Sequence, residues 1–363
     1  MAETSETVMS QSEQKDELAR SKSRKAVNQS FWSLVRHQFK KNKISLAALY
    51  VVFLLFGIAI FADFLANDKP IVAKYDGTLY FPIMKDYLTG LGLDRWPAEI
   101  VNSDWKELDK QGKLSSTFWP LIKWRPSNQD LVNNTAPPGG DHVLGTDAIG
   151  RDVLAGIIHG SRIALTIGFL SMFFAISIGI ILGAMAGFYG GWVDMIISRL
   201  IELVITFPVF FLIITVVAMF QTGSIWLVMI LIGLVSWPSI ARFTRGEFLR
   251  VRNMEYVSAA TALGLSNKRV IFRHVLPNSL APVLVTSAFG IASAILTEAG
   301  LSFLGFGVPP TIVTWGSVLN DARGNITAWW LAVFPGFMIF ISVLCYNLVG
   351  DGLRDALDPR LRD

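Results

Sequence analysis

The sequence contains few of the side chains on which most catalytic sites and nucleic-acid surfaces depend. Of its 363 residues only 17% are charged, four are histidine, and Cys345 is the one cysteine. A single cysteine excludes an intrachain disulfide framework and a zinc site built from thiolates. The histidines have no HExxH spacing, and no GxxxxGK[ST] phosphate loop occurs. We therefore expect no catalytic residue, metal site or bound cofactor in this chain, and no enzymatic activity of its own.

Apolar residues are abundant instead, at 52% of the chain with a mean hydropathy of +0.47. They occur in long blocks, and a helix needs about 20 mostly apolar residues to cross a bilayer. Such blocks predict an all-α membrane protein with six transmembrane helices. The expected spans are Ile44–Leu65, Ile163–Phe188, Leu200–Phe220 with Pro208 inside it, Ile225–Ile240, Leu280–Leu296 and Trp329–Val349.

The basic residues predict the orientation of these helices. Residues 20–43 carry eight Lys/Arg and no acid, and residues 242–277 carry seven Lys/Arg against two acids. Since cytoplasmic loops are enriched in Lys and Arg, both segments and both termini are expected inside the cell. Residues 66–141, with ten acids and nine bases, then lie outside. The net charge of +4 thus reflects topology, and we expect the bilayer rather than nucleic acid as a partner.

The predicted organisation follows from these spans. Residues 1–43 form a cytoplasmic segment whose residues 31–41 are expected to be an amphipathic helix on the inner leaflet, or a simple lead-in to the first span. That first span covers 44–65. Residues 66–160 are expected to form an outer cap of turns and short helices, which either contacts a substrate or delivery protein or acts as a lid. The five-helix core spans 161–349, and 350–363 form a cytoplasmic tail.

Few charged residues fall within the predicted spans. Glu202 and Glu298 lie towards span ends and are candidates for a pore lining. Acids inside a membrane are costly and usually functional, so a structural or pore-wetting role stands beside proton coupling. Glycines recur every fourth residue at Gly179, Gly183 and Gly187. This small-xxx-small pattern predicts close packing against a second helix.

The inner segment 242–277 is far longer than a simple connection requires. Met254–Leu263 is helix-compatible, Gly264 is placed as its C-cap, and Ser266 can begin a second short helix that ends before Pro277. Two capped helices with a tight glycine turn would form a knob able to insert into a cleft on a cytoplasmic protein.

The same segment resembles the EAA loop of ABC importer permeases. The resemblance is carried by Ala259-Ala260-Thr261-Ala262-Leu263-Gly264 and the later Leu276-Pro277. The sequence departs from the motif at Ser258, where the motif has Glu, and at His274, where it has Ile. The nearby Glu255 can supply the acid.

Further motifs resemble the dipeptide/oligopeptide branch of these permeases and extend the resemblance over residues 140–363. They are His142–Asp147 with Gly150-Arg151-Asp152, Tyr189–Asp194, Glu298–Gly305 and Gly350–Asp355 with Asp358-Pro359-Arg360. The outer segment, with Ala66–Pro70 and Tyr80-Phe81-Pro82, looks like the insertion of the permease of microcin C and oligopeptide importers, the Yej type.

This resemblance implies the type I ABC importer permease fold, with a periplasmic insertion after the first helix, in a bacterial inner membrane. It also implies a heterodimer with a second homologous permease, ATPase subunits or a fused double ATPase that bind ATP and Mg, and a periplasmic peptide-binding protein. The cargo would be oligopeptides or peptide-like compounds such as microcin C. The ATPase-coupling residues would be Glu255, Ser258, Ala259, Ala260 and Gly264, with Arg252 and Lys268 at the rim.

A polar motif precedes the second span, comprising Gly145, Thr146, Asp147, Gly150, Arg151 and Asp152. We expect Asp147 to cap a helix that begins near Ala148. Arg151 and Asp152 can pair with headgroups, the partner permease or a docked binding protein, or serve local capping alone.

Two other classes of protein fit the sequence less well than the importer. A stand-alone secondary transporter or channel would need charges at mid-membrane and inverted repeats, and neither is visible in the sequence. A membrane enzyme would need His, Asp or Ser groups clustered at one depth.

Overall fold

The structure is a computed structural model that describes residues 31–97, 100–101, 103–220 and 224–357. Helices make up most of it. Before the outer segment lie α2 (Phe31–Lys41), α3 (Lys43–Ile60) and α4 (Ala62–Leu65). The outer segment contains β1 (Val72–Tyr75), β2 (Thr78–Tyr80), α5 (Pro82–Gly90), α6 (Trp105–Lys110) and β3 (Leu114–Phe118). The rest comprises α7 (Val153–Tyr189), α8 (Gly191–Thr206), α9 (Val209–Phe220), α10 (Ile225–Arg252), α11 (Glu255–Ala262), α12 (Asn267–Val270), a π-helical turn (Ile271–Val275), α13 (Leu276–Phe303), α14 (Trp315–Gly324) and α15 (Trp330–Leu357).

Five unbroken helical stretches of the described chain are long and apolar enough to cross a membrane. They are α3, α7, α10, the stretch from α12 through α13, and α15. A bent pair, α8 with α9, makes a sixth span if its two halves are counted together. The six expected spans are thus present, but several helices are longer than predicted. In particular, α7 begins at Val153 rather than near Ile163, so residues 153–160, eight of those assigned to the outer cap, belong to this helix.

The third span is not the straight helix expected over residues 200–220. Its two halves meet at Phe207 and Pro208 with a bend of 78°. Proline has no N–H to donate, and its ring clashes with the preceding turn, so the helix ends before Pro208 and restarts after it. The first half also begins earlier than predicted, at Gly191. The prediction placed the proline correctly and missed its effect.

The glycine ridge on α7 lies against α10, as the four-residue spacing predicted. A Cβ added to Gly179 would lie 2.6 Å from the Cβ of Ile240, and one on Gly187 would lie 2.6 Å from that of Phe248. Such distances leave no room for any side chain larger than hydrogen. The two helices therefore approach backbone to backbone, and α7 and α10 behave as one packed unit.

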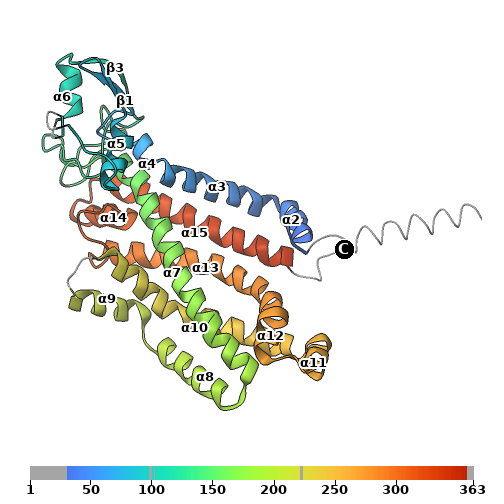
Figure 1. The fold of residues 1–363 in the computed structure, drawn as a ribbon. Helices are drawn as coiled ribbons and strands as arrows, with labels where there is room; N and C mark the ends of the chain where they lie inside the picture. Colours follow the sequence, from blue (N-terminus) through green and yellow to red (C-terminus); the bar gives the residue numbers. More distant parts are fainter. Residues whose placement is uncertain (1–30, 98–99, 102, 221–223, 358–363) are drawn as a thin grey trace, which may run out of the picture.

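The elements divide between the two ends of the bundle. Figure 1 shows α3 and α15 side by side, with α7 crossing towards α10, and the outer segment with α5, α6 and the strands at one end. α2, α11 and α12 lie at the other end. This arrangement separates the polar outer segment from the two basic segments, so each end presents a different chemical surface.

The outer segment contains a β-sheet that the all-α prediction missed. β1 pairs antiparallel with β2 and β3 in the order β2-β1-β3, with Ala73 opposite both Tyr80 and Thr117. Asp76-Gly77, a dipeptide typical of tight turns, forms the β1–β2 hairpin, with φ of 48° and 77° at the two residues. Strands this short carry little alternation, which is why the sequence predicted only turns and short helices.

The helix expected over residues 31–41 is confirmed as α2, and it contacts both α3 and α15. Gly352 on α15 accommodates both helices, because a Cβ there would lie 2.3 Å from the Cβ of Ser45 on α3 and 3.0 Å from the ring of Phe39 on α2. Part of the apolar face of α2 is therefore covered by protein. Its contact with the inner leaflet stays a prediction.

Candidate functional site

The knob between α10 and α13 forms much as the capping residues predicted. α11 ends in a Schellman motif: Gly264, with φ of 78°, donates its N–H to the carbonyl of Thr261 at 2.9 Å, and Leu265 donates to that of Ala260 at 3.2 Å. Glycine is favoured at this position because a side chain is strained at positive φ. Ser266 stands at the N-cap of α12, without a side-chain hydrogen bond to that helix.

The second helix of the knob does not end before Pro277, contrary to the prediction. α12 passes through the π-helical turn at Ile271–Val275 directly into α13, where Pro277 occupies the first turn. Pro277 has no N–H to donate to Arg273, four residues earlier, and Arg273 lies in the π-helical turn, where the regular hydrogen-bond pattern is interrupted. The non-helical connections of the knob thus shrink to short turns, and its second helix is rigidly continuous with a spanning helix.

A small valine-rich core anchors the knob to the ends of α7 and α10. Phe248, Val251, Val257, Val270 and Val275 are all buried in one cluster. Ala260 is also enclosed, at 8% exposure, so it supports the knob from within and is removed from the proposed docking surface. The other predicted docking positions, Glu255, Ser258, Ala259, Gly264 and Lys268, are exposed.

Two large apolar side chains complete the outer surface of the knob. Leu263 is 81% exposed and Phe272 is 68% exposed, and Tyr256 lies on the same small element. Sequence reasoning missed them because an apolar residue in an amphipathic helix is ordinarily assigned to the core. Arg252, predicted at the rim, is exposed and donates to the carbonyl of Phe188 at 2.6 Å near the end of α7.

The motif before α7 forms a compact loop, in which Asp152 rather than Asp147 caps the helix. Asp147 is buried and accepts from the backbone N–H of Ile149 at 3.0 Å and of Arg151 at 2.8 Å, so it closes a loop rather than capping a helix. Asp152 is the N-cap of α7 and accepts from Ala155 N–H at 2.7 Å. His142 Nδ1 lies 2.9 Å from the same carboxylate.

Thr146, Gly145 and Gly150 join this loop to segments distant in the sequence. The Thr146 carbonyl accepts from the indole of Trp330 on α15 at 3.0 Å. A Cβ on Gly145 would lie 2.6 Å from the Ala136 carbonyl, and one on Gly150 would lie 2.1 Å from that of Asp130. Both glycines have positive φ. The motif therefore fixes the outer loop onto the helix ends, a structural role that sequence reasoning had offered as an alternative.

Arg151 links this loop to α14 through a pair of aspartates. Its guanidinium lies 2.5 Å from Asp147 and 3.3 Å from Asp321. Burial, with the negative charge of Asp147, raises the pKa of Asp321 to about 6, although Arg151 opposes the shift. One cation shared between a buried acid and a half-buried one leaves the second acid under-compensated.

The predicted pore acids do not line the cavity between the helices. Glu298 is 1% exposed and accepts from Ser302 at 2.6 Å, enclosed where α13 meets α14. Glu202 pairs with Arg199 at 2.6 Å on an exposed face of α8. Neither contributes to the groove described next.

A groove of about 530 Å³ runs between α7, α9, α10 and α13. Its walls are apolar side chains with five hydroxyls. The lining residues are Met172, Val209, Phe210, Ile232, Val235, Ser236, Ser239, Ile240, Thr286, Phe289, Gly290, Ser293 and Thr297. No charged side chain is among them. A neutral groove that carries hydroxyl groups can hydrogen-bond a polar chain without selecting its charge.

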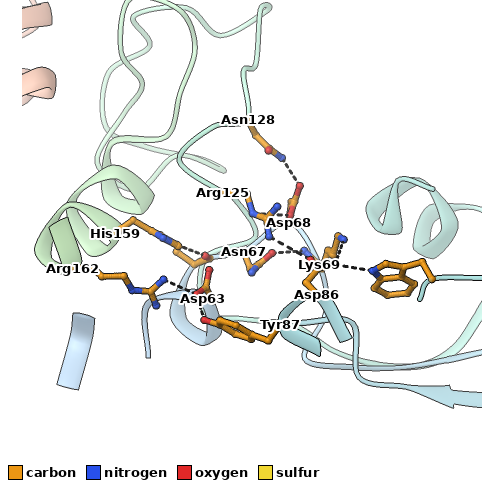
Figure 2. Close-up of polar contacts among 12 residues, drawn as sticks. Asp63, Asn67, Asp68, Lys69, Asp86, Tyr87, Arg125, Asn128, His159 and Arg162 are labelled. Atoms are coloured by element: carbon orange, nitrogen blue, oxygen red, sulfur yellow. Dashed lines mark hydrogen bonds and ion pairs between the residues drawn. The ribbon is translucent and has the colours of Figure 1, made fainter. Parts of the chain in front are cut away.

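A second polar network holds the outer segment onto the bundle (Figure 2). Arg162 on α7 donates to the carbonyl of Ala59 at 2.9 Å and to Asp63 at 2.8 Å. His159 Nε2 lies 2.8 Å from the carbonyl of Ala66. Since the last carbonyls of a helix lack intrahelical partners, Arg162 caps α3 while binding the first residues of the outer segment. This fixes the insertion to the second span.

Comparisons with known proteins agree with this architecture. The family model described as "Binding-protein-dependent transport system inner membrane component" matches residues 179–363, and that described as "N-terminal TM domain of oligopeptide transport permease C" matches residues 30–82. Inner membrane ABC transporter permease protein YejE of Escherichia coli is 35% identical over 92% of this chain and 97% of its own.

Two further relatives differ in their stated cargo. Peptidoglycan transport system permease protein YejE of Agrobacterium fabrum is 33% identical over 89% of this chain and 91% of its own. Dipeptide transport system permease protein DppC of Alkalihalophilus pseudofirmus is 42% identical over 69% of this chain and 82% of its own. A structure of the inward-facing MetNI methionine ABC transporter is 18% identical, with a TM-score of 0.47 over 57% of this chain and 98% of that chain.

Proposed function

The chain belongs to the family of binding-protein-dependent transport system inner membrane components, the permeases of ABC importers, and we propose that it forms half of a peptide-conducting pore. The other half is a second, homologous permease, in a heterodimer. Relatives named for dipeptides, oligopeptides and peptidoglycan share a peptide bond or peptide-like part in their cargo, so oligopeptides or peptide-like compounds such as microcin C are the proposed substrates.

The groove supports a peptide as the cargo. Its neutral lining does not select substrates by their charge. The hydroxyls of Ser236 and Thr286 donate to backbone carbonyls of their own helices. Their lone pairs remain available to accept N–H groups of a peptide backbone. A backbone is the part that all peptides share, so a surface that accepts from it tolerates many side chains.

The single observation that carries the proposed coupling is the knob. Its apolar surface at Leu263 and Phe272 stands on a rigid core and is continuous, through α10 and α13, with the groove. α10 has 28 residues and so extends about 40 Å at ~1.5 Å per residue. We infer that cytoplasmic ATPase subunits, or a fused double ATPase, bind this surface and hydrolyse ATP with Mg, and this chain hydrolyses none.

Alternating access follows from this lever. When the ATPases close on ATP, the knob moves with them, and α10 and α13 carry the displacement to the groove. The change requires that the knob make different contacts in the two states, because a partner with equal affinity for both cannot shift their balance. In the proposed orientation both termini and the knob lie in the cytoplasm of a bacterium, while the outer segment faces a periplasmic peptide-binding protein.

The test compares two equally exposed leucines at opposite ends. Leu263→Asp places a charge on the knob, and Leu121→Asp does the same in the outer segment, where Leu121 is also 81% exposed. Burying an aspartate in an apolar interface should weaken ATPase binding roughly tenfold or more. Co-purification with the ATPase and peptide-stimulated ATP hydrolysis should fall for Leu263→Asp only. Wild-type association in that variant would refute the proposed coupling surface.

A further inference from the structure

A pocket of about 340 Å³ lies in the outer segment, separate from the groove between the spanning helices. It is formed by α4, α5 and the chain that follows β3. The lining residues are Asp63, Asn67, Ile83, Asp86, Tyr87, Gly90, Leu91 and Arg125. Carboxylates, a guanidinium and apolar carbons therefore border one space. Its volume is at the lower end of the ~300–1,000 Å³ of small-molecule sites.

Asp63 has one oxygen engaged and one free, whereas the second oxygen of Asp86 has only a long ion pair, at 3.6 Å, with Arg125. Asp63 accepts from the hydroxyl of Tyr87 and from Arg162 on the same oxygen, Oδ2. Asp86 accepts from Lys69 at 2.8 Å and from the indole of Trp96 at 2.9 Å, both on Oδ1. Figure 2 shows these contacts. Asp63 Oδ1 and Asp86 Oδ2 accept no hydrogen bond from any residue that the structure describes.

Asp63 stays ionised in this setting. Burial acts to raise its pKa, but the hydrogen bonds from Tyr87 and Arg162, with the positive charge of Arg162, outweigh burial and lower the pKa below its ordinary value. A free carboxylate oxygen on a group that is ionised at neutral pH is an acceptor for an ammonium.

The cation of the pocket is only loosely engaged. Arg125 lies 3.6 Å from Asp86 through Nη2 and 3.6 Å from Asp68 through Nε, and its side chain is 34% exposed. Both distances exceed a hydrogen bond, and within the described part of the chain its guanidinium donates none. A guanidinium has five N–H donors in a fork that matches a carboxylate. Arg125 therefore keeps the capacity to bind a carboxylate in the pocket.

We propose that this pocket binds a small zwitterion, a free amino acid or a short peptide, with its ammonium at Asp63 and Asp86 and its carboxylate at Arg125. Ile83 forms an apolar part of the wall and Leu91, which is exposed, stands at the rim, so an aliphatic side chain can be accommodated. The charge pattern of the pocket stands independently of import. The choice of a peptide as the natural occupant rests on the proposed function.

The experiment uses the complete complex in nanodiscs, without the binding protein, and isothermal titration calorimetry. The probes are leucine, leucinamide, N-acetylleucine and the dipeptide alanyl-leucine. Leucinamide lacks the carboxylate and N-acetylleucine lacks the ammonium. We expect leucine or alanyl-leucine to bind and each capped analogue to bind roughly tenfold or more weakly. Whichever of leucine and alanyl-leucine binds more tightly shows whether the zwitterion is a free amino acid or a short peptide. Equal binding of capped and free ligands, or no binding by either zwitterion, would overturn the proposal.

Variants test the assignment of the carboxylate to Arg125. Arg125→Met should bring leucine down to the affinity of leucinamide, while Lys123→Met, a nearby cation outside the pocket, should leave both unchanged. Arg125→Lys keeps the charge and should retain part of the preference for leucine, which separates loss of the contact from damage to the outer segment. An unchanged leucine preference in Arg125→Met contradicts the assignment.

Uptake of peptides into proteoliposomes, with the binding protein present, separates this inference from the proposed function. Uptake without any zwitterion binding would reject the pocket and leave the importer standing. Zwitterion binding without uptake would reject the import of peptides and leave the pocket standing.

Discussion

Replacing Gly183 by alanine tests whether the contact between α7 and α10 holds the bundle together. The added Cβ would lie 2.5 Å from the carbonyl oxygen of Ala241 and 2.7 Å from the Cβ of Thr244. Ordinary contacts of this kind begin near 3.4 Å. Because backbone atoms form the obstacle, a rotamer change does not relieve the clash, and the two helices must separate by about 1 Å.

The magnitude follows from what overpacking costs in a well-packed interior. Inserting one methyl group into such a contact destabilises by about 1–3 kcal/mol. Alanine also has a higher helix propensity than glycine, by up to about 1 kcal/mol, which works in the opposite direction. Gly57→Ala on α3 gains the same propensity without a clash, since nothing lies within 4 Å of its Cβ position. The difference between the two variants therefore isolates the contact.

The buried thiol provides the assay. Cys345 is the one cysteine of this chain and lies in the core on α15, so it reacts with a maleimide when the bundle opens. Labelling is followed by mass spectrometry of the peptide that contains Cys345, during a temperature ramp on the purified complex. Gly183→Ala should label at a clearly lower temperature than the wild type, and Gly57→Ala at the same or a higher one. Identical labelling curves for the two variants would refute the packing argument.

Three further predictions concern the knob, the outer loop and the insertion. Gly264→Ala forces a side chain to positive φ, at about 1–2 kcal/mol, and should reduce peptide-stimulated ATP hydrolysis, whereas Gly246→Ala, with open space and helical backbone, should not; equal hydrolysis by both contradicts the role of the turn. Because the pKa of Asp321 is raised to about 6, the folded protein retains a proton between pH ~3.8 and 6 that the unfolded chain has lost. The stability that Asp321 contributes is therefore fully present below pH ~3.8 and is lost as the pH rises through 6. Asp321→Asn should thus be more stable than the wild type at pH 7.5, by at most about 3 kcal/mol, and equal to it near pH 4; a thermal-shift titration with parallel curves would disprove this. Arg162→Met removes the cap on α3 and should make the outer segment more sensitive to protease in nanodiscs, with the exposed Arg199→Met as the control; equal cleavage rates would show that other contacts fix the insertion.

The sequence predicted those features that depend on local chemistry. The apolar blocks predicted the spanning helices, since apolar stretches of this length are typical of helices that cross a bilayer. The Asp76-Gly77 hairpin, α2 and the C-cap at Gly264 follow from residues within one or two turns of each other. The ridge at Gly179–Gly187 predicted a closely packed neighbouring helix but did not identify it.

Other placements depended on how the chain folds around a residue rather than on its position in a regular pattern. Asp147 and Asp152 both carry the signature of an N-cap, and only the loop folded by Arg151 decides which of them performs it. Ala260 is enclosed because Val257 beside it packs against α10 and α13. Glu298 is buried where α14 packs against α13, with Gly316 of α14 close to Ala299 and Ser302.

The sequence by itself determined that the chain is a helical membrane protein with a capped knob and a long insertion, because hydrophobic length and capping motifs depend on consecutive residues. Its motifs also carried the resemblance to the permeases of ABC importers. The tertiary structure alone decided which side chains share a space. The groove draws its lining from four helices, and the outer pocket joins Asp63 to Arg125 across the insertion. Such sites arise from packing between segments remote in the chain, and no local pattern encodes that packing.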